Sequence, residues 1–320
     1  MSILPRLSLK CYTFAMNFKS EFKKQFSEIL FNEKLSKYST FQIGGPADFF
    51  YKLKNTNELN PLLSFAKKHH LKYFIIGGGS NILFDDKGFR GLIIKIETKN
   101  ITIKNTEIIA DAGISIATLL NTSITHALTG LEPWIGLPGT VGGAVRGNAG
   151  CNGLECKKIL SSATILNPKT NKIRTVSNKY FQFKYRQSKL KQTKEIVLNA
   201  TFKLKKRQTN AAEQKNLITK IRKSRIDKQP FGSSTGSFFR NPSTNQPAGF
   251  LIEQVGLKGK TIGKAQISTK HANFLLNIGG ATSQNIIKLA NLVRKLVKAK
   301  FGLILEEEVQ ILTPKGPKKL

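Results

Sequence analysis

Glycine is concentrated in one part of the chain, residues 130–153, which read GLEPWIGLPGTVGGAVRGNAGCNG. Glycine loses more conformational entropy on folding than any other residue, so a chain keeps many glycines where its backbone must pass very close to something else. A Pro-Gly turn lies within the segment, and almost none of its side chains is large. We therefore expect the backbone here to lie against a large, flat ligand.

The length and composition favour a soluble protein with two or three domains. The chain has 320 residues, and its 40% apolar content is enough for more than one hydrophobic core. No apolar run reaches the length of a membrane-spanning helix, and the N-terminal residues lack the pattern of a signal peptide. A second methionine, Met16, precedes the first helix-like segment, so we interpret residues 1–17 as an extension.

Cysteine is sparse. The three cysteines, Cys11, Cys151 and Cys156, are too few for a disulfide framework, which suits a reducing compartment and predicts a cytoplasmic protein. Cys151 and Cys156 lack the paired spacing and histidine partners of a zinc site. We expect free thiols and no bound metal.

The formal net charge is +33, which by itself favours nucleic acid or an anionic surface as a partner. Most of the positive charge is lysine, however, and it is spread through the predicted helices and strands alike. No helix-turn-helix, zinc finger or aromatic-basic RNA-binding signature accompanies it. We therefore expect no dedicated nucleic-acid or membrane partner, while an anionic small-molecule substrate remains compatible with the charge.

Hydrophobic periodicity predicts a mixture of helices and strands, and so an α+β protein. The predicted helices cover residues 57–70, 115–129 with Ser115 as cap, a segment ending near Arg225, and 283–301 with Ser283 as cap. The predicted strands cover residues 73–76, 92–96, 101–110, 163–166, 172–176 and 195–204. A basic polar stretch, residues 205–212, marks the boundary before a third unit.

A glycine loop, residues 77–81 (GGGSN), follows the short apolar strand predicted at 73–76. Consecutive backbone N–H groups in such a loop can bind an anion, and Ser80 and Asn81 add side-chain donors. The loop lacks the lysine of a P-loop, and Ile82 stands where the dinucleotide fingerprint has its third glycine. Taken alone, the loop is explained equally well as an ordinary tight turn.

The chain resembles the UDP-N-acetylenolpyruvoylglucosamine reductase family from about Ser36 to Leu312. Its motifs occur in the family's order, and so many ordered motifs make chance similarity implausible. They are STFQIGGPA from Ser39, IGGGSNIL from Ile76, GLPGTVGGAV from Gly136, NAG from Asn148, YRQS from Tyr185, GSFFRNP from Gly236, AGFLIEQVGLKG from Ala248, KHANF from Lys270 and LEEEV from Leu305.

The resemblance implies an α+β fold in which two subdomains of the vanillyl-alcohol-oxidase (PCMH) type bind FAD and a third α+β domain binds the substrate. We expect the first FAD-binding subdomain at 18–82, the second at 83–207, the substrate-binding domain at 208–312 and a tail at 313–320. The third domain would carry Glu308 on its last strand. The spacing between Arg186 and Ser237 resembles the shorter family branch, which lacks an inserted tyrosine loop.

The resemblance also implies the cofactors and the reaction. NADPH would reduce FAD, and flavin N5 would then pass a hydride to UDP-N-acetylglucosamine enolpyruvate, giving UDP-N-acetylmuramate for peptidoglycan precursor synthesis. The residues expected at the FAD are Gly77, Gly78, Gly79, Ser80, Asn81, Pro138, Gly139, Thr140, Gly142, Gly143 and Asn148. Small residues there have a steric reason, because hydride transfer needs the reacting atoms held at close range.

Three positions match the family's catalytic residues. Arg186 would hold the substrate carboxylate and stabilise the enolate-like charge, and Ser237 would donate the proton. In a strand, Glu306 and Glu308 share a face and Glu307 points away, so periodicity leaves two candidates and the family position selects Glu308. We expect Glu308 to be at least partly protonated with substrate bound, because a full carboxylate would repel the developing enolate.

Residues in further matching segments are expected to bind the diphosphate and uridine: Arg225, Gln229, Arg240, Asn241 and Lys270. His271 would position a hydrogen bond rather than act as a base. Cys151 and Asn152 replace the Ala-Tyr common after the family's NAG motif, and Arg146-Gly147 replaces a bulkier apolar residue before it. We expect a monomer. The alternatives are another flavin oxidoreductase of the same superfamily, which GSFFRNP and LEEEV disfavour, and a basic nucleic-acid binder.

Overall fold

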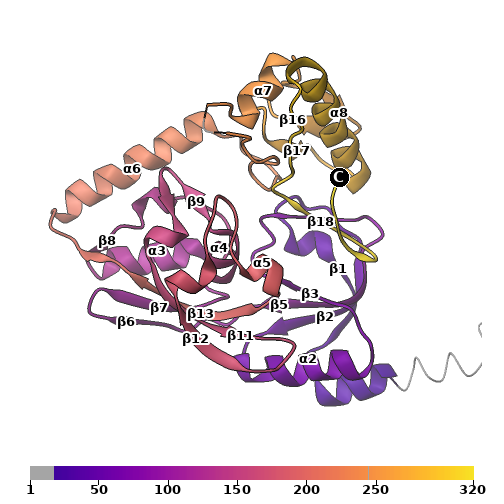
Figure 1. Cartoon of the computed structure of the whole chain (residues 1–320), viewed down its shortest axis with the longest axis vertical. Helices are drawn as coiled ribbons and strands as arrows, with labels where there is room; N and C mark the ends of the chain where they lie inside the picture. The colour runs from indigo at the N-terminus through magenta and orange to yellow at the C-terminus, as the bar shows by residue number, and fades with distance from the viewer. Residues whose placement is uncertain (1–17, 244) are drawn as a thin grey trace, which may run out of the picture.

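The structure is a computed structural model that describes residues 18–243 and 245–320. The predicted extension at 1–17, with Cys11 and Met16, lies outside the described residues. Figure 1 shows two adjoining sheet-containing parts and a smaller third part above them. Helix α6 runs from the second part to the third.

The first part is a four-stranded sheet with the order β1-β2-β5-β3. Strands β2, β5 and β3 run parallel, which explains why β5 is an almost continuous buried apolar run. Helix α2 buries its apolar stripe against the sheet, where Phe65 stacks on Phe22. The bounds are β1 Leu30–Lys34, β2 Pro46–Leu53, α2 Leu59–Lys68, β3 Tyr73–Ile76, β4 Ile82–Phe84 and β5 Phe89–Ile96.

The second part is a five-stranded antiparallel sheet with the order β12-β11-β13-β7-β6. Its core is continuous with that of the first part, since one cluster of buried side chains includes both Leu62 and Phe202. The bounds are β6 Ile101–Lys104, β7 Glu107–Asp111, α3 Ile116–Thr125, β8 Leu128–Thr129, α4 Val141–Gly147, β9 Gly150–Cys151, β10 Leu154–Glu155, β11 Leu160–Leu166, β12 Ile173–Ser177, α5 Leu190–Thr193, β13 Ile196–Lys203 and β14 Lys205–Lys206.

The third part is built around a second buried core, to which Phe41, Ile43 and Leu83 of the first part also contribute, and helix α6 leads to it. Within α6 the buried residue is Gln214, as expected of a helix that is polar all round and spans the space between domains. The bounds are α6 Ala211–Lys228, α7 Ala248–Gln254, β15 Thr261–Ile262, β16 Ala265–Ile267, β17 Leu275–Asn277, α8 Ser283–Phe301, β18 Gln310–Thr313 and β19 Gly316–Lys318.

The chain returns to its first part at the end. Strand β18 pairs in parallel with β4, with Gln310 opposite Ile82, and β19 pairs with β18. Glu308 was expected on the last strand, but it lies just before β18, where the third part meets the first. The domain boundaries expected from the sequence stay a prediction.

Most predicted helices and strands are present, with three corrections. The strand predicted at 101–110 is a hairpin, β6 and β7, because Asn105 turns the chain at φ +57°. The helix that Ser115 caps ends at Thr125, before strand β8. The N-cap of α8 is Thr282, whose hydroxyl accepts the Asn285 N–H in a capping box, so Ser283 is instead the first helical residue. No described helix is long and apolar enough to span a membrane.

Candidate active site

The glycine loop at 77–81 and the glycine-rich segment lie directly against each other. A Cβ atom added to Gly78 would stand 3.1 Å from the Gly139 Cα, and one added to Gly77 would stand 2.3 Å from the Thr140 Oγ1. Gly79 has φ +64°, and a Cβ there would stand 1.8 Å from the Tyr38 carbonyl oxygen. Gly77 and Gly78 are therefore required for the two loops to approach each other, and Gly79 is required for the first loop to pass Tyr38.

Several hydrogen-bonding groups of the glycine loop and the glycine-rich segment have no partner within the described residues. The Thr140 hydroxyl, at the N-cap of α4, is buried and has no partner among the described residues. No hydrogen bond within the described chain uses the N–H groups of Gly78, Gly79 or Ser80. Unpaired N–H groups in a glycine loop can bind an anion, so the loops fit the diphosphate of a dinucleotide such as FAD.

Two other residues expected at the cofactor, Gly142 and Asn148, make close contacts within the protein itself. Gly142 packs against β7, since its added Cβ would stand 2.9 Å from that of Ala112. Asn148 is fully buried at φ +44°, and its side chain bonds the Lys184 carbonyl and the Lys157 N–H, each at 3.0 Å. Pro138 is exposed, and Gly143 contacts Thr140 only loosely. The Asn148 side chain thus joins the glycine-rich segment to the loop that carries Arg186.

Arg186 and Glu308 meet although they lie far apart in the sequence. The Arg186 Nε is 2.8 Å from a Glu308 carboxylate oxygen, and both side chains are largely buried. Arg186 also lies over Gly150, where an added Cβ would stand 2.7 Å from its guanidinium. Arg186 has φ +54°, a conformation that costs about 1–3 kcal/mol in a residue other than glycine. The structure therefore holds this arginine at the edge of the glycine-rich segment.

The segment that contains Ser237 runs beside the segment that contains Glu308. The Glu308 N–H donates to the Phe238 carbonyl at 2.8 Å, and the Arg240 N–H donates to that of Glu306 at 2.9 Å. Buried Asn273 holds the same segment, because its side chain bonds both the N–H and the carbonyl of Phe239. Arg186, Glu308 and the Ser237 segment are thus brought together.

The glycine loop also reaches this cluster. The Asn81 side chain donates to the Glu308 carbonyl at 3.2 Å, and the Asn81 carbonyl accepts the Gln310 N–H at 3.0 Å. Asn81 therefore links the expected cofactor loop to the expected catalytic glutamate.

Glu306 and Glu308 flank Glu307, which forms a β-bridge with Phe239. The environments of the two flanking glutamates differ. Glu306 is 73% exposed and lies 3.5 Å from Arg240, whereas Glu308 is 17% exposed. Burial raises the pKa of the Glu308 carboxyl, and the cations of Arg186, Lys191 and Arg240 only partly oppose that shift. Of the two candidates that strand periodicity leaves open, Glu308 is thus the buried one, in contact with Arg186.

The residues expected to bind the diphosphate and uridine border the same region. Arg225, in the last turn of α6, reaches the glycine-rich segment, and its Nη1 lies 3.4 Å from the Ile135 carbonyl and 3.1 Å from the Cys151 Sγ. Gln229 caps α6, and Lys270 donates to the Ile226 carbonyl near the end of that helix.

Arg240 and Asn241 continue the Ser237 segment towards α7. The Asn241 side chain accepts the Ala248 N–H at 3.0 Å, and its own N–H lies 3.5 Å from the Tyr185 hydroxyl. The five expected substrate residues therefore form two groups, one at the end of α6 and one beside Glu308.

Sequence reasoning missed three residues at this cluster. Lys191 donates to the Arg186 carbonyl at 2.6 Å, and half-buried Arg146 donates to the Gln310 side chain at 3.3 Å. Asn273 belongs to the KHANF motif but received no role. Motif position could have suggested Asn273, whereas nothing in the local sequence singles out Lys191 among so many lysines.

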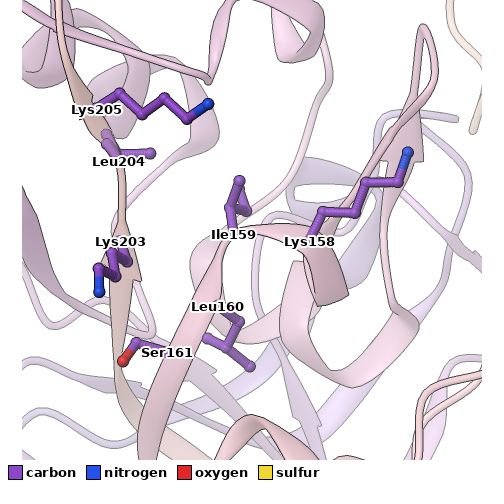
Figure 2. A pocket seen from close by; sticks show the side chains of 7 residues that line it. All are labelled: Lys158, Ile159, Leu160, Ser161, Lys203, Leu204 and Lys205. Atoms are coloured by element: carbon purple, nitrogen blue, oxygen red, sulfur yellow. The ribbon is translucent and has the colours of Figure 1, made fainter.

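A separate surface pocket of about 340 Å³ lies between the start of β11 and the end of β13. Figure 2 shows its lysines, of which Lys158 and Lys203 point in different directions rather than towards a common point. None of the expected site residues lines it. Since binding sites need convergent polar groups, the cluster around Arg186 is the better candidate.

Two protein family models match parts of this chain. Residues 47–177 match the FAD binding domain, and residues 225–312 match the UDP-N-acetylenolpyruvoylglucosamine reductase C-terminal domain. The UDP-N-acetylenolpyruvoylglucosamine reductase of Caldanaerobacter subterraneus subsp. tengcongensis is 37% identical over 290 residues, which cover 90% of this chain and 95% of that protein. That of Chlamydia abortus is 39% identical, over 87% and 92% of the two chains. The chain belongs to the UDP-N-acetylenolpyruvoylglucosamine reductase family.

A solved structure supports the same conclusion. The family member from Thermus caldophilus aligns with a TM-score of 0.75 and 29% identity, over 89% of this chain and 98% of that one. The α+β fold, with an FAD-binding part and the family's own C-terminal domain, is therefore confirmed. So is the prediction of an FAD-dependent oxidoreductase of this family, with NADPH as co-substrate.

Proposed function

We propose that this family member reduces UDP-N-acetylglucosamine enolpyruvate to UDP-N-acetylmuramate, with Arg186, Ser237 and Glu308 as its catalytic residues. The observation that carries the proposal is that Arg186 and Glu308 contact each other beside the Ser237 segment, at the edge of the paired glycine loops. We further propose that the reaction runs in the cytoplasm, as part of peptidoglycan precursor synthesis.

The paired loops would hold the cofactor. The N–H groups of Gly78, Gly79 and Ser80, together with the Thr140 hydroxyl, supply donors that the protein does not use. When bound, FAD supplies the hydride that NADPH delivers to the site. The protein must then orient the substrate, stabilise the charge that develops and supply a proton.

Arg186 would bind the substrate carboxylate. The guanidinium offers planar paired donors that suit a carboxylate, and it keeps its charge throughout the reaction. As the vinyl group accepts a hydride, negative charge spreads onto that carboxylate, so the interaction strengthens in the transition state. The existing ion pair with Glu308 supports this role, because Arg186 already binds a carboxylate at this point.

Ser237 would donate the proton to the second carbon of the former double bond. A serine hydroxyl is a weak acid, so it can act only when held at a strongly basic carbon. Its segment is fixed by two hydrogen bonds from the Asn273 side chain to Phe239 and by pairing with the Glu308 segment. Such fixation is what proton transfer at a defined position requires.

Glu308 would change partner when the substrate binds. A substrate carboxylate that pairs with Arg186 takes away the cation nearest to Glu308, and a second negative charge then lies close by. Both effects add to the burial that already raises the pKa of Glu308, and so favour its protonated form. A neutral Glu308 can donate a hydrogen bond to the enolate-like oxygen instead of repelling it.

Arg225 and Gln229 at the end of α6, with Arg240, Asn241 and Lys270, would contact the diphosphate and uridine. Arg146, Arg186 and Lys191 add further positive charge nearby, which suits an anionic ligand.

The test is substrate-dependent NADPH oxidation by the purified protein, which we expect to carry bound flavin absorption. Ser237→Ala should lower product formation by about 10²–10⁴-fold while NADPH still reduces the flavin at its usual rate. Ser233→Ala is the matched control and should leave both rates unchanged, because this nearby serine lies outside the pairing with the Glu308 segment and its side chain makes no hydrogen bond among the described residues. A protein that binds flavin but oxidises NADPH at a rate independent of this substrate would instead favour another flavin oxidoreductase. A protein without flavin absorption would favour the nucleic-acid binder.

A further inference from the structure

The Arg186 backbone is held in place from two sides. Lys184 and Gln187 exchange two backbone hydrogen bonds around it, at 3.1 and 3.0 Å, which closes a tight loop with Arg186 at φ +54°. Lys191, from the short helix α5, donates its ammonium to the Arg186 carbonyl at 2.6 Å. A strained conformation persists only where its surroundings fix it, so this bond bears directly on where the guanidinium points.

Lys191 is half-buried among charges from several elements. Facing it are Arg146 of α4, Arg186 of its own loop, Arg240 beside the Ser237 segment, and the carboxylate of Glu308. Glu306 is exposed and lies beyond Arg240. The positive charges facing Lys191 thus outnumber the negative ones, and burial further disfavours its ammonium form. Burial, Arg240, Arg146 and Arg186 lower the pKa of Lys191 to about 8, against the raising effect of Glu308.

We propose that Lys191 is a positioning residue, whose ammonium group fixes Arg186 for substrate binding and is stabilised by the anionic substrate. The inference rests on the proposed function, because it takes the substrate to carry a carboxylate and a diphosphate. Those charges would offset the surrounding cations and so favour the ammonium form. Without its proton, Lys191 keeps N–H donors but loses the charge-assisted bond to the Arg186 carbonyl.

The sign of the pH effect follows. Below about pH 8 the free protein has Lys191 already charged, so Lys191 takes up no proton when the substrate binds. Above that pH the amine is neutral, so binding must take up one proton and becomes up to tenfold weaker for each pH unit. The KM for the enolpyruvyl sugar nucleotide should therefore rise above about pH 8, while Lys191 itself adds no pH dependence to kcat, because in the complex it is already protonated.

Steady-state kinetics between pH 6.5 and about 9.5 test this with three variants. Lys191→Met should raise KM about tenfold or more at pH 7 and abolish the alkaline rise. Lys191→Arg, which stays charged, should restore a low KM that no longer depends on pH. Lys194→Met, an exposed lysine next to the end of α5, is the control and should match the wild type.

Calorimetry with the same substrate, in two buffers of different ionisation enthalpy at pH 8.5, should show that the wild type takes up more protons on binding than Lys191→Met does. Flavin content and thermal unfolding check that each variant is folded. If the wild type turns over with a KM independent of pH, or if Lys191→Met keeps the wild-type profile, the inference is wrong although the proposed function stands. If the wild type does not reduce the substrate, the proposed function fails, and the inference fails with it.

Discussion

The Glu308 carboxyl group lies among cations, yet burial has the larger effect on its protonation equilibrium. Because its pKa is raised, it keeps its proton to higher pH than an exposed glutamate. If the neutral form is the active one, kcat should fall as the pH rises through this pKa. Glu308→Gln cannot ionise, so that part of the kcat profile should disappear, and Glu308→Ala should lower kcat by about 10²-fold or more.

Glu306→Gln is the matched comparison for this prediction, since Glu306 is the exposed neighbour on the same side of the segment. It should leave the pH profile of kcat as in the wild type. A Glu308→Gln enzyme with the wild-type profile would show that Glu308 is not the titrating group.

Single residues also show how far the sequence alone could lead. Arg186, Ser237 and Glu308 could be selected because each belongs to a motif with its own flanking residues. Their convergence could not be predicted, since it depends on pairing between segments far apart in the chain. Lys191 had no motif, and its importance comes only from the charges that the fold assembles around it.

Among the elements, the paired glycine loops make a sharp prediction about cofactor binding. An alanine at Gly78 would place its Cβ 3.1 Å from the Gly139 Cα, which is backbone and cannot easily move away. Gly78→Ala should therefore separate the loops and weaken FAD binding by about tenfold or more, on the basis that misplaced donors lose about 1.4 kcal/mol or more. The measurement is flavin affinity by fluorescence titration.

Gly147→Ala at the end of α4 is the control, because no described atom would lie within 4 Å of its new Cβ. We expect this variant to bind FAD as the wild type does. Equal losses in the two variants would mean that loop contact is not what limits flavin affinity.

Periodicity predicted those elements whose burial follows one face, such as α2, α8 and β13. Periodicity did not predict elements that depend on a single turn residue or on one close packing contact. The turn at Asn105 depends on one left-handed residue inside an alternating run, so the run read as a single strand. Helix α4 is rich in glycine and lacks a helical pattern, and it forms because Gly142 fits closely against Ala112.

At the scale of the whole molecule, Asp86 connects the first part of the chain to the third. Its carboxylate accepts both the N–H and the hydroxyl of Ser283, at 2.7–3.0 Å, at the start of α8. Asp86→Ala would leave the buried Ser283 without these acceptors, so the free energy of unfolding should fall by about 1–3 kcal/mol. Chemical denaturation of the flavin-free protein measures the change.

Asp227→Ala removes an exposed carboxylate from α6 and should leave the free energy of unfolding unchanged. Equal stability of the Asp86→Ala variant and the wild type would mean that the contact between the two parts does not contribute to global unfolding.

The pairing of β18 with β4 has a consequence for how the protein is made. Strand β4 is translated well before its partner β18, because all the elements from β5 to α8 lie between them in the chain. Until then β4 lacks its neighbour, and Asn81 lacks the Glu308 carbonyl that it binds. The cofactor loop therefore cannot reach its final arrangement on a growing chain. An incomplete protein, released too early, would accordingly carry the whole FAD-binding sequence and still lack a finished cofactor site.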